Sequence, residues 1–119
     1  MKVKNSKNVL IETVIAIGDL KIEIWTSDFQ HALQGHPEVT IEKVREAVIK
    51  PAQVIQSRKN NLVCLFYSSG LMSKEFGTIY FCVVVRILLK GSGKLETAYE
   101  TNYIKSGINL LCSKKRGVK

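Results

Sequence analysis

Apolar and polar residues alternate near the start of the chain as they do in strands that bury one face. Lys21–Trp25 alternates strictly, and the preceding segment Val9–Ile17 is rich in β-branched residues. Gly18 and Asp19 lie between the two segments and are typical turn residues. The pattern therefore predicts an N-terminal β-hairpin.

Helical spacing of apolar residues predicts two short helices after this hairpin. The first begins at one of the capping residues Thr26–Asp28. It ends near Gly35, because Pro37 disfavours helical geometry at the residue before it. The second helix covers Ile41–Ile49, with Thr40 as its N-cap and with its apolar residues along one side.

Most of the remaining chain consists of apolar and β-branched runs, which indicate strands. The predicted strands are Ala52–Arg58, Leu62–Tyr67, Thr78–Leu89 and Lys94–Tyr103, with a short addition at Ile108–Cys112. Thr78–Leu89 is apolar on both faces, so we expect it to be the central strand, with Val83 and Val85 buried. The predicted fold class is α+β, in which an N-terminal hairpin and two helices pack on a four-stranded, mainly antiparallel sheet.

The composition indicates one basic domain. We expect a single domain over residues 1–119. The 18 Lys and Arg residues against 10 Asp and Glu residues give a net charge of +8, which favours an anionic partner, above all nucleic acid. Part of the excess lies in Lys114–Arg116 and Lys119, so we expect a basic tail from about residue 113, whose order the sequence leaves open.

The cysteines favour a reduced protein. Cys64, Cys82 and Cys112 cannot all pair within one chain, and none has C-x-x-C or zinc-type spacing. Each has apolar neighbours, so we expect buried thiols in a reducing compartment.

The apolar segments do not predict a membrane protein. Ile79–Leu89 is interrupted by Arg86 and is too short to span a bilayer. Glu12 interrupts the N-terminal apolar stretch, which otherwise resembles a signal peptide. We therefore expect a cytoplasmic protein without membrane contact.

The two histidines are the first candidates for chemistry. The chain lacks the phosphate-loop, G-x-G-x-x-G, H-E-x-x-H and G-x-S-x-G motifs, which excludes the enzyme classes that depend on them. His31 and His36 would point roughly 140° apart on a continuous helix, so we expect no shared metal ion and no cofactor. Imidazole transfers protons near neutral pH, and Pro37 takes His36 off the helix, so the rings need not diverge. The alternative is a pair of surface histidines.

Hydroxyl groups and arginines form the second and third candidate groups. One face of a predicted strand carries Thr97, Tyr99 and Thr101, and the opposite face carries Glu96, Ala98 and Glu100. A half-exposed structural strand shows the same pattern. Arg58 and Arg86 are the candidate cations. Arg86 interrupts an apolar strand, so it needs a partner or an anion, unless its charged end reaches solvent at the strand end.

Taken together, these segments resemble a group of small bacterial and phage proteins related to the barnase–EndoU–colicin–RelE superfamily of ribonuclease-like folds. The resemblance covers roughly Ile22 to Lys105. Its short segments are His31 to Glu38, a helix ending at Pro51, Ala52–Ser57, the strand ending at Tyr67, Val83–Val85 and Thr97–Thr101. It implies N-terminal helices on a four-stranded antiparallel sheet and RNA cleavage without a metal ion, in many members as toxins. The implied partners are RNA and a protein inhibitor or antitoxin.

The resemblance also implies roles for single residues. It places His31, Thr97, Tyr99 and Thr101 at the site, with Arg58 and Arg86 as the cations. Together with the candidate groups above, we expect catalytic roles for His31 as base or acid, for His36 as its complement, and for Tyr99 and Thr101, and RNA or phosphate binding by Arg58, Arg86, Thr97 and Tyr67. Tyr67 or Trp25 would stack on a base. The chain departs from the family pattern because no lysine accompanies His31 on its helix and because Glu96 and Glu100 are expected on the face opposite Tyr99. The alternatives are a non-catalytic nucleic-acid- or protein-binding module of the same fold, and a toxin-like subunit whose edge strand is occupied by an antitoxin.

Overall fold

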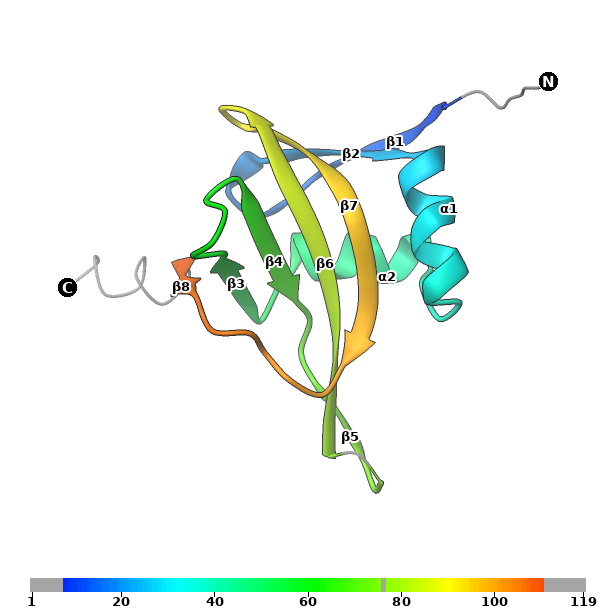
Figure 1. The fold of residues 1–119 in the computed structure, drawn as a ribbon, viewed down its shortest axis with the longest axis vertical. Coiled ribbons are helices and arrows are strands. Elements are labelled where there is room, and N and C mark those ends of the chain that lie inside the picture. The colour runs from blue at the N-terminus through cyan, green and yellow to red at the C-terminus, as the bar shows by residue number, and fades with distance from the viewer. Residues whose placement is uncertain (1–7, 76, 111–119) are drawn as a thin grey trace.

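β-strands outnumber helices in the computed structural model, which describes residues 8–75 and 77–110 (Figure 1). The elements are β1 (Leu10–Ile15), β2 (Lys21–Trp25), α1 (Thr26–Gly35), α2 (Ile41–Ile49), β3 (Gln53–Gln56), β4 (Val63–Tyr67), β5 (Leu71–Ser73), β6 (Gly77–Leu89), β7 (Ser92–Thr101) and β8 (Ile108–Asn109). A 3-10 turn joins β1 to β2, where Gly18 and Asp19 have positive φ angles of 75° and 64°. Glycine adopts this conformation readily and aspartate tolerates it, so these two residues make the predicted hairpin turn.

The sheet differs from the predicted one. The described strands form a mixed eight-stranded sheet in the order β1-β2-β7-β6-β4-β3-β8, and β5 pairs with the start of β6. The α+β class is correct, but the prediction of a four-stranded, mainly antiparallel sheet is wrong, because the N-terminal hairpin, β5 and β8 also pair with its strands and β2 pairs with β7 in parallel.

The parallel pair between β2 and β7 connects the hairpin to the other strands. Lys21 lies opposite Ser92, and Glu23 lies opposite Lys94. Partners this far apart in sequence leave no local signal, since the alternation of β2 is the same for a parallel or an antiparallel neighbour. The short strand β5 was also missed, because three residues are too few to show a period of two.

Both helices lie where the sequence predicts them. The hydroxyl of Thr40 accepts a hydrogen bond from the N–H of Lys43 at 3.1 Å, which caps α2. His36 leaves the helical conformation after α1, while its N–H still bonds to the carbonyl of Ala32 at 2.8 Å. In Figure 1, α2 lies behind the sheet and α1 lies beside β7.

Apolar clusters pack against both faces of the central strand β6. The larger cluster faces the helices, and in it Val83 and Val85 have no exposed surface, as predicted. The smaller cluster lies on the opposite face and contains Ile55, Leu65, Tyr67 and Cys82. β6 is therefore the covered central strand that its sequence indicates.

The structure confirms two of the cysteine predictions. Cys64 and Cys82 are buried free thiols. Cys112 and the basic tail predicted from about residue 113 lie outside the described residues. Among the described helices, none has the length and apolar character needed to cross a bilayer.

Candidate functional site

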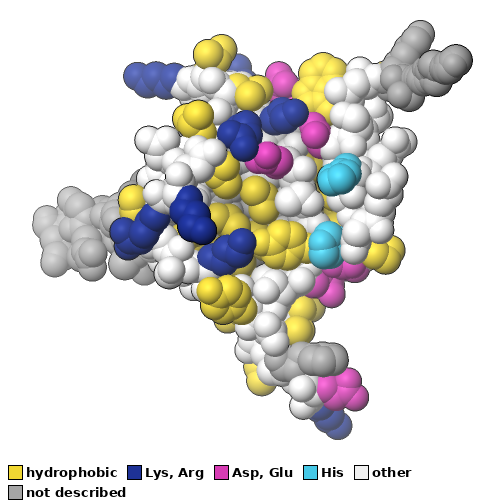
Figure 2. Space-filling model, viewed as in Figure 1, with side chains coloured by type: hydrophobic (Ala, Val, Ile, Leu, Met, Phe, Trp, Pro, Cys, Tyr) yellow, Lys and Arg dark blue, Asp and Glu magenta, His cyan; other side chains and the backbone are white. Residues whose placement is uncertain are grey.

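The sheet face that points away from α2 carries most of the residues singled out by the sequence. The side chains of β6 and β7 on this side of the sheet are Tyr80, Cys82, Val84, Arg86, Glu96, Thr97, Tyr99 and Thr101, of which Cys82 is buried beneath its neighbours. We call this surface the open face. Figure 2 shows it with apolar side chains in the middle, Lys and Arg side chains on one side of them and both histidines on the other.

His36 lies at the edge of the open face, between a carboxylate and an aromatic ring. Its Nδ1 is 3.5 Å from Oε2 of Glu38, and its ring centroid is 5.5 Å from that of Tyr99. The His36 side chain is 44% exposed, so solvent or a ligand reaches it. A carboxylate at Nδ1 favours the tautomer whose Nε2 is free to accept a proton, and it stabilises the imidazolium formed afterwards.

The carboxylate of Glu38 is itself held in place. Its Oε2 accepts a hydrogen bond from the N–H of Glu100 at 3.1 Å. Partial burial alone would raise the pKa of Glu38, but the backbone N–H groups of Glu100 and of Glu38, together with the charges of His36 and Lys43, leave that pKa below its usual value. Glu38 therefore stays ionised beside His36 at neutral pH.

His31 lies in the middle of α1 with an exposed side chain. Both histidines are visible on the open face in Figure 2. In the part of the chain that the structure describes, His31 has no carboxylate partner of the kind that His36 has. The better positioned imidazole is therefore that of His36.

The three hydroxyl residues of β7 share the open face, as predicted, but two of the hydroxyls point to protein partners. Tyr99 lies opposite Cys82, and its hydroxyl is directed to that thiol within the smaller cluster. Burial raises the pKa of Tyr99, so it remains protonated. The Thr101 hydroxyl donates to the carbonyl of Tyr103 at 3.2 Å. Thr97 lies opposite Val84, and no hydrogen bond of its hydroxyl is found among the described residues.

A bulge corrects the predicted position of Glu96. The register between β6 and β7 shifts between Val84 and Val85, so that Leu95 and Ala98 both face the helix-side cluster. The two residues between them turn to the open face, where Glu96 accepts a hydrogen bond from Arg86 at 3.1 Å. Glu96 thus lies on the same face as Tyr99, and the partner that Arg86 requires is a carboxylate of the neighbouring strand.

Tyr67 is not available for the predicted stacking on a base. Its side chain has no exposed surface, and its hydroxyl accepts a hydrogen bond from the N–H of Lys105 at 3.1 Å. Trp25 remains the candidate stacking ring, since it is only half-buried and its Nε1 donates to Glu23 at 2.9 Å. Arg58 is exposed in the β3–β4 connection. Two strands, β4 and β6, separate β3 from β7, which carries the hydroxyl residues.

The residues that sequence reasoning missed are those that orient His36. Glu38 was noticed only as a neighbour in the chain, and its partners Glu100 and Lys43 come from β7 and α2. A His-Pro-Glu sequence is the available local signal, because it returns a carboxylate to the imidazole two residues earlier. In residues 8–75 and 77–110, no group of three or more His, Cys, Asp or Glu side chains could hold a metal ion.

Comparisons with known proteins add no family to this description. No family model matches the sequence, and neither the curated proteins nor the solved structures contain a match. The resemblance to the barnase–EndoU–colicin–RelE superfamily therefore remains a prediction from the sequence.

Proposed function

We propose that this protein cleaves RNA without a metal ion, with His36 as the group that transfers the proton. The observation that carries the proposal is the exposed imidazole held between Glu38 and Tyr99 at the edge of the open face. Lys and Arg side chains lie on the same face, across the apolar centre (Figure 2). The net charge of +8 belongs to the whole chain, and the described residues carry 11 Lys and Arg against 10 Asp and Glu, so attraction of a phosphate backbone to this face depends on the cations that lie on it.

The chemistry needs only the RNA and the protein. Nε2 of His36 takes the proton of the ribose 2′-hydroxyl while the 2′-oxygen attacks the adjacent phosphorus. The bond from phosphorus to the 5′-oxygen breaks, and that oxygen receives a proton from an acid, for which His31 is the candidate. The products are a 2′,3′-cyclic phosphate and a 5′-hydroxyl. Glu38 stabilises the imidazolium that forms on His36, as a carboxylate does beside other catalytic histidines.

A non-catalytic RNA-binding module is the second candidate, and a specific observation favours it. Several groups that could otherwise bind phosphate are already engaged within the protein. Arg86 bonds to Glu96, Lys94 lies 3.3 Å from Asp28, and the Thr101 hydroxyl donates to a backbone carbonyl. Such a surface can bind RNA through its remaining cations while lacking the donors that stabilise a pentacoordinate phosphate.

The first experiment incubates the purified protein with total RNA in EDTA and follows cleavage on a gel. We expect fragments with cyclic phosphate ends from the wild type. His36→Ala should lower the rate by roughly 10²–10⁴-fold, the range typical of a lost acid or base. Intact RNA with retained, salt-sensitive binding would establish the non-catalytic module instead, and intact RNA without binding would reject both candidates.

Variants of Tyr99 form a matched pair for the same assay. Tyr99→Phe keeps the ring that contacts His36 and removes a hydroxyl that points to Cys82, so we expect nearly unchanged cleavage. Tyr99→Leu removes the ring and should slow cleavage. A large loss from Tyr99→Phe would show that the hydroxyl, rather than the ring, serves the reaction.

A further inference from the structure

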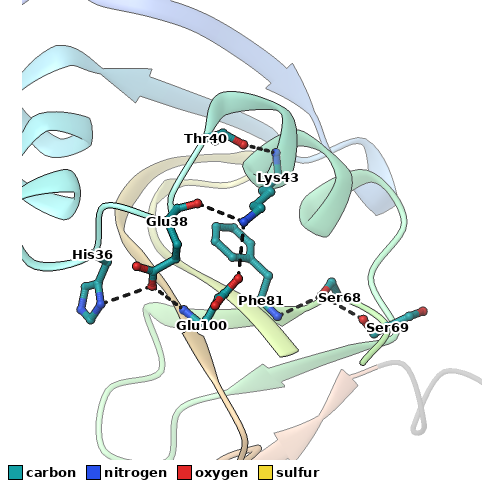
Figure 3. Close-up of polar contacts among 8 residues, drawn as sticks. All are labelled: His36, Glu38, Thr40, Lys43, Ser68, Ser69, Phe81 and Glu100. Carbon is teal, nitrogen blue, oxygen red and sulfur yellow. Dashed lines mark hydrogen bonds and ion pairs between the residues drawn. The ribbon is translucent and has the colours of Figure 1, made fainter. Parts of the chain in front are cut away.

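We propose that Lys43 is a positioning residue that keeps the carboxylate of Glu38 beside Nδ1 of His36. The inference rests on the proposed function of His36, and it concerns a residue that never needs to touch RNA. It is carried by a closed ring of polar contacts in which Lys43 and Glu100 each meet Glu38 (Figure 3).

The ring consists of three links. Nζ of Lys43 donates to the backbone carbonyl of Glu38 at 3.1 Å and to Oε2 of Glu100 at 3.4 Å. The N–H of Glu100 then donates to the carboxylate of Glu38 at 3.1 Å. Glu38 is therefore bound at its main chain by α2 and at its side chain by β7. Both its position and its orientation are fixed.

The Lys43 side chain starts from a defined point and lies against a defined surface. Its own N–H is held by the Thr40 cap at 3.1 Å, which sets the first turn of α2. Its ammonium group lies 5.8 Å from the centroid of the Phe81 ring, within the range of a cation–π contact. Figure 3 shows Nζ between the Glu38 carbonyl and the Glu100 carboxylate, next to the side chain of Phe81.

The ring matters to His36 because one oxygen serves two contacts. Oε2 of Glu38 accepts the N–H of Glu100 and also lies 3.5 Å from Nδ1 of His36. If the loop carrying Glu38 turns, this oxygen leaves Nδ1 and nothing selects the tautomer that exposes the lone pair of Nε2. Since the Lys43 and Glu100 side chains are more than 40% exposed, water replaces their lost contact and the fold survives, while the geometry around Glu38 loosens.

Lys50 provides a matched control. It directly follows the end of α2, seven residues after Lys43, and lines the same groove of about 280 Å³. It has the same charge, and the described residues include no ion pair for it. A change at Lys50 therefore reports the loss of a positive charge near the site without the loss of the ring.

The test compares Lys43→Met, Lys43→Arg and Lys50→Met by two measurements on the full chain. Long-range ¹⁵N–¹H NMR reports which nitrogen of His36 carries the proton, and the RNA assay gives the cleavage rate. We expect Lys43→Met to mix the tautomers and to lower kcat by roughly 3- to 30-fold, with unfolding temperature nearly unchanged. Lys43→Arg should restore most of both, and Lys50→Met should change neither.

A double variant asks whether the ring acts as a unit. Glu100→Gln keeps its backbone N–H and loses the charge that meets Lys43. Combined with Lys43→Met it should lower the rate little further than either change alone. Additive losses would show that the two residues act separately.

The two proposals fail in different ways. If wild-type protein leaves RNA intact, the proposed function is wrong, and the NMR comparison still decides whether Lys43 orients His36. If the wild type cleaves RNA while Lys43→Met keeps the tautomer and the rate, the positioning role is wrong and the catalytic proposal stands. Equal losses from Lys43→Met and Lys50→Met would also overturn the positioning role, because charge alone would then explain them.

Discussion

Alkaline conditions should destabilise this protein through a buried cluster on the open-face side of β6. Burial raises the pKa of Cys82 from 9.0 to about 11 and that of its neighbour Tyr67 from 10.0 to about 12. Between the unfolded and the native pKa of each group, the unfolded chain loses a proton that the native protein retains. The free energy of unfolding therefore falls as the pH rises, starting near the unfolded value of the thiol.

The size of the effect follows from the shift. Each unit of difference in pKa contributes about 1.36 kcal/mol. For the Cys82 shift, integration from about pH 8 to about pH 10 gives a loss of roughly 1.3 kcal/mol, while Tyr67 adds only a few tenths over that interval. In urea denaturation, this loss corresponds to a fall in the midpoint of roughly 0.5–1 M.

Cys82→Ala isolates the contribution of the thiol. The variant leaves every other titratable group in place. The comparison uses only the change in the free energy of unfolding between the two pH values, so a lower overall stability of the variant does not affect it. We expect its loss over that interval to be smaller than the wild-type loss by most of that roughly 1.3 kcal/mol. Equal losses in the two proteins would refute the reasoning, since the thiol would then titrate alike in the folded and unfolded chains.

Three further predictions test other parts of the structure. Cys64 and Cys82 should react slowly with a thiol reagent in the native protein and quickly in denaturant, and rapid native labelling of both would contradict their burial. The hydrogen bond and charge of Arg45 lower the pKa of Glu12, so the ionised carboxylate stabilises the protein above its unfolded pKa and loses that effect as the pH falls. The free energy of unfolding of Glu12→Gln should therefore decline less steeply with falling pH than that of the wild type. Parallel declines in the two proteins would argue against the pair. Amide hydrogens in the middle of β6 should exchange among the slowest in the chain, and exchange as fast as that of loop amides would disprove its central position.

The parts of the fold that the sequence predicts well are those encoded by near neighbours. Thr40 bonds to an N–H three residues later, and Pro37 acts on the residue before it, so both helices have their predicted limits. The strand pairs beyond the hairpins depend on distant partners. The parallel contact of β2 with β7 and the bulge beside Val84 satisfy packing conditions that no local window contains.

The same division applies to the candidate site. Both histidines and the hydroxyl face of β7 could be predicted from residue type and from the period of two. The engagement of Arg86 by Glu96 could not, because it depends on the bulge that turns Glu96 to the open face. The ring around Glu38 joins a loop, a helix and a strand, and therefore becomes visible only when all three are placed in space.

The parallel pairing of β2 with β7 has a consequence for how the chain is made. The hairpin of β1 and β2 is synthesised before its partner strand β7, which follows both helices and the long strand β6. A two-stranded hairpin is barely stable alone, and Ile22 and Ile24, fully covered in the finished sheet, stay uncovered until then. During synthesis this apolar surface is exposed to other nascent chains, and a product that stops before Ser92 would keep its hairpin without the strand that receives it.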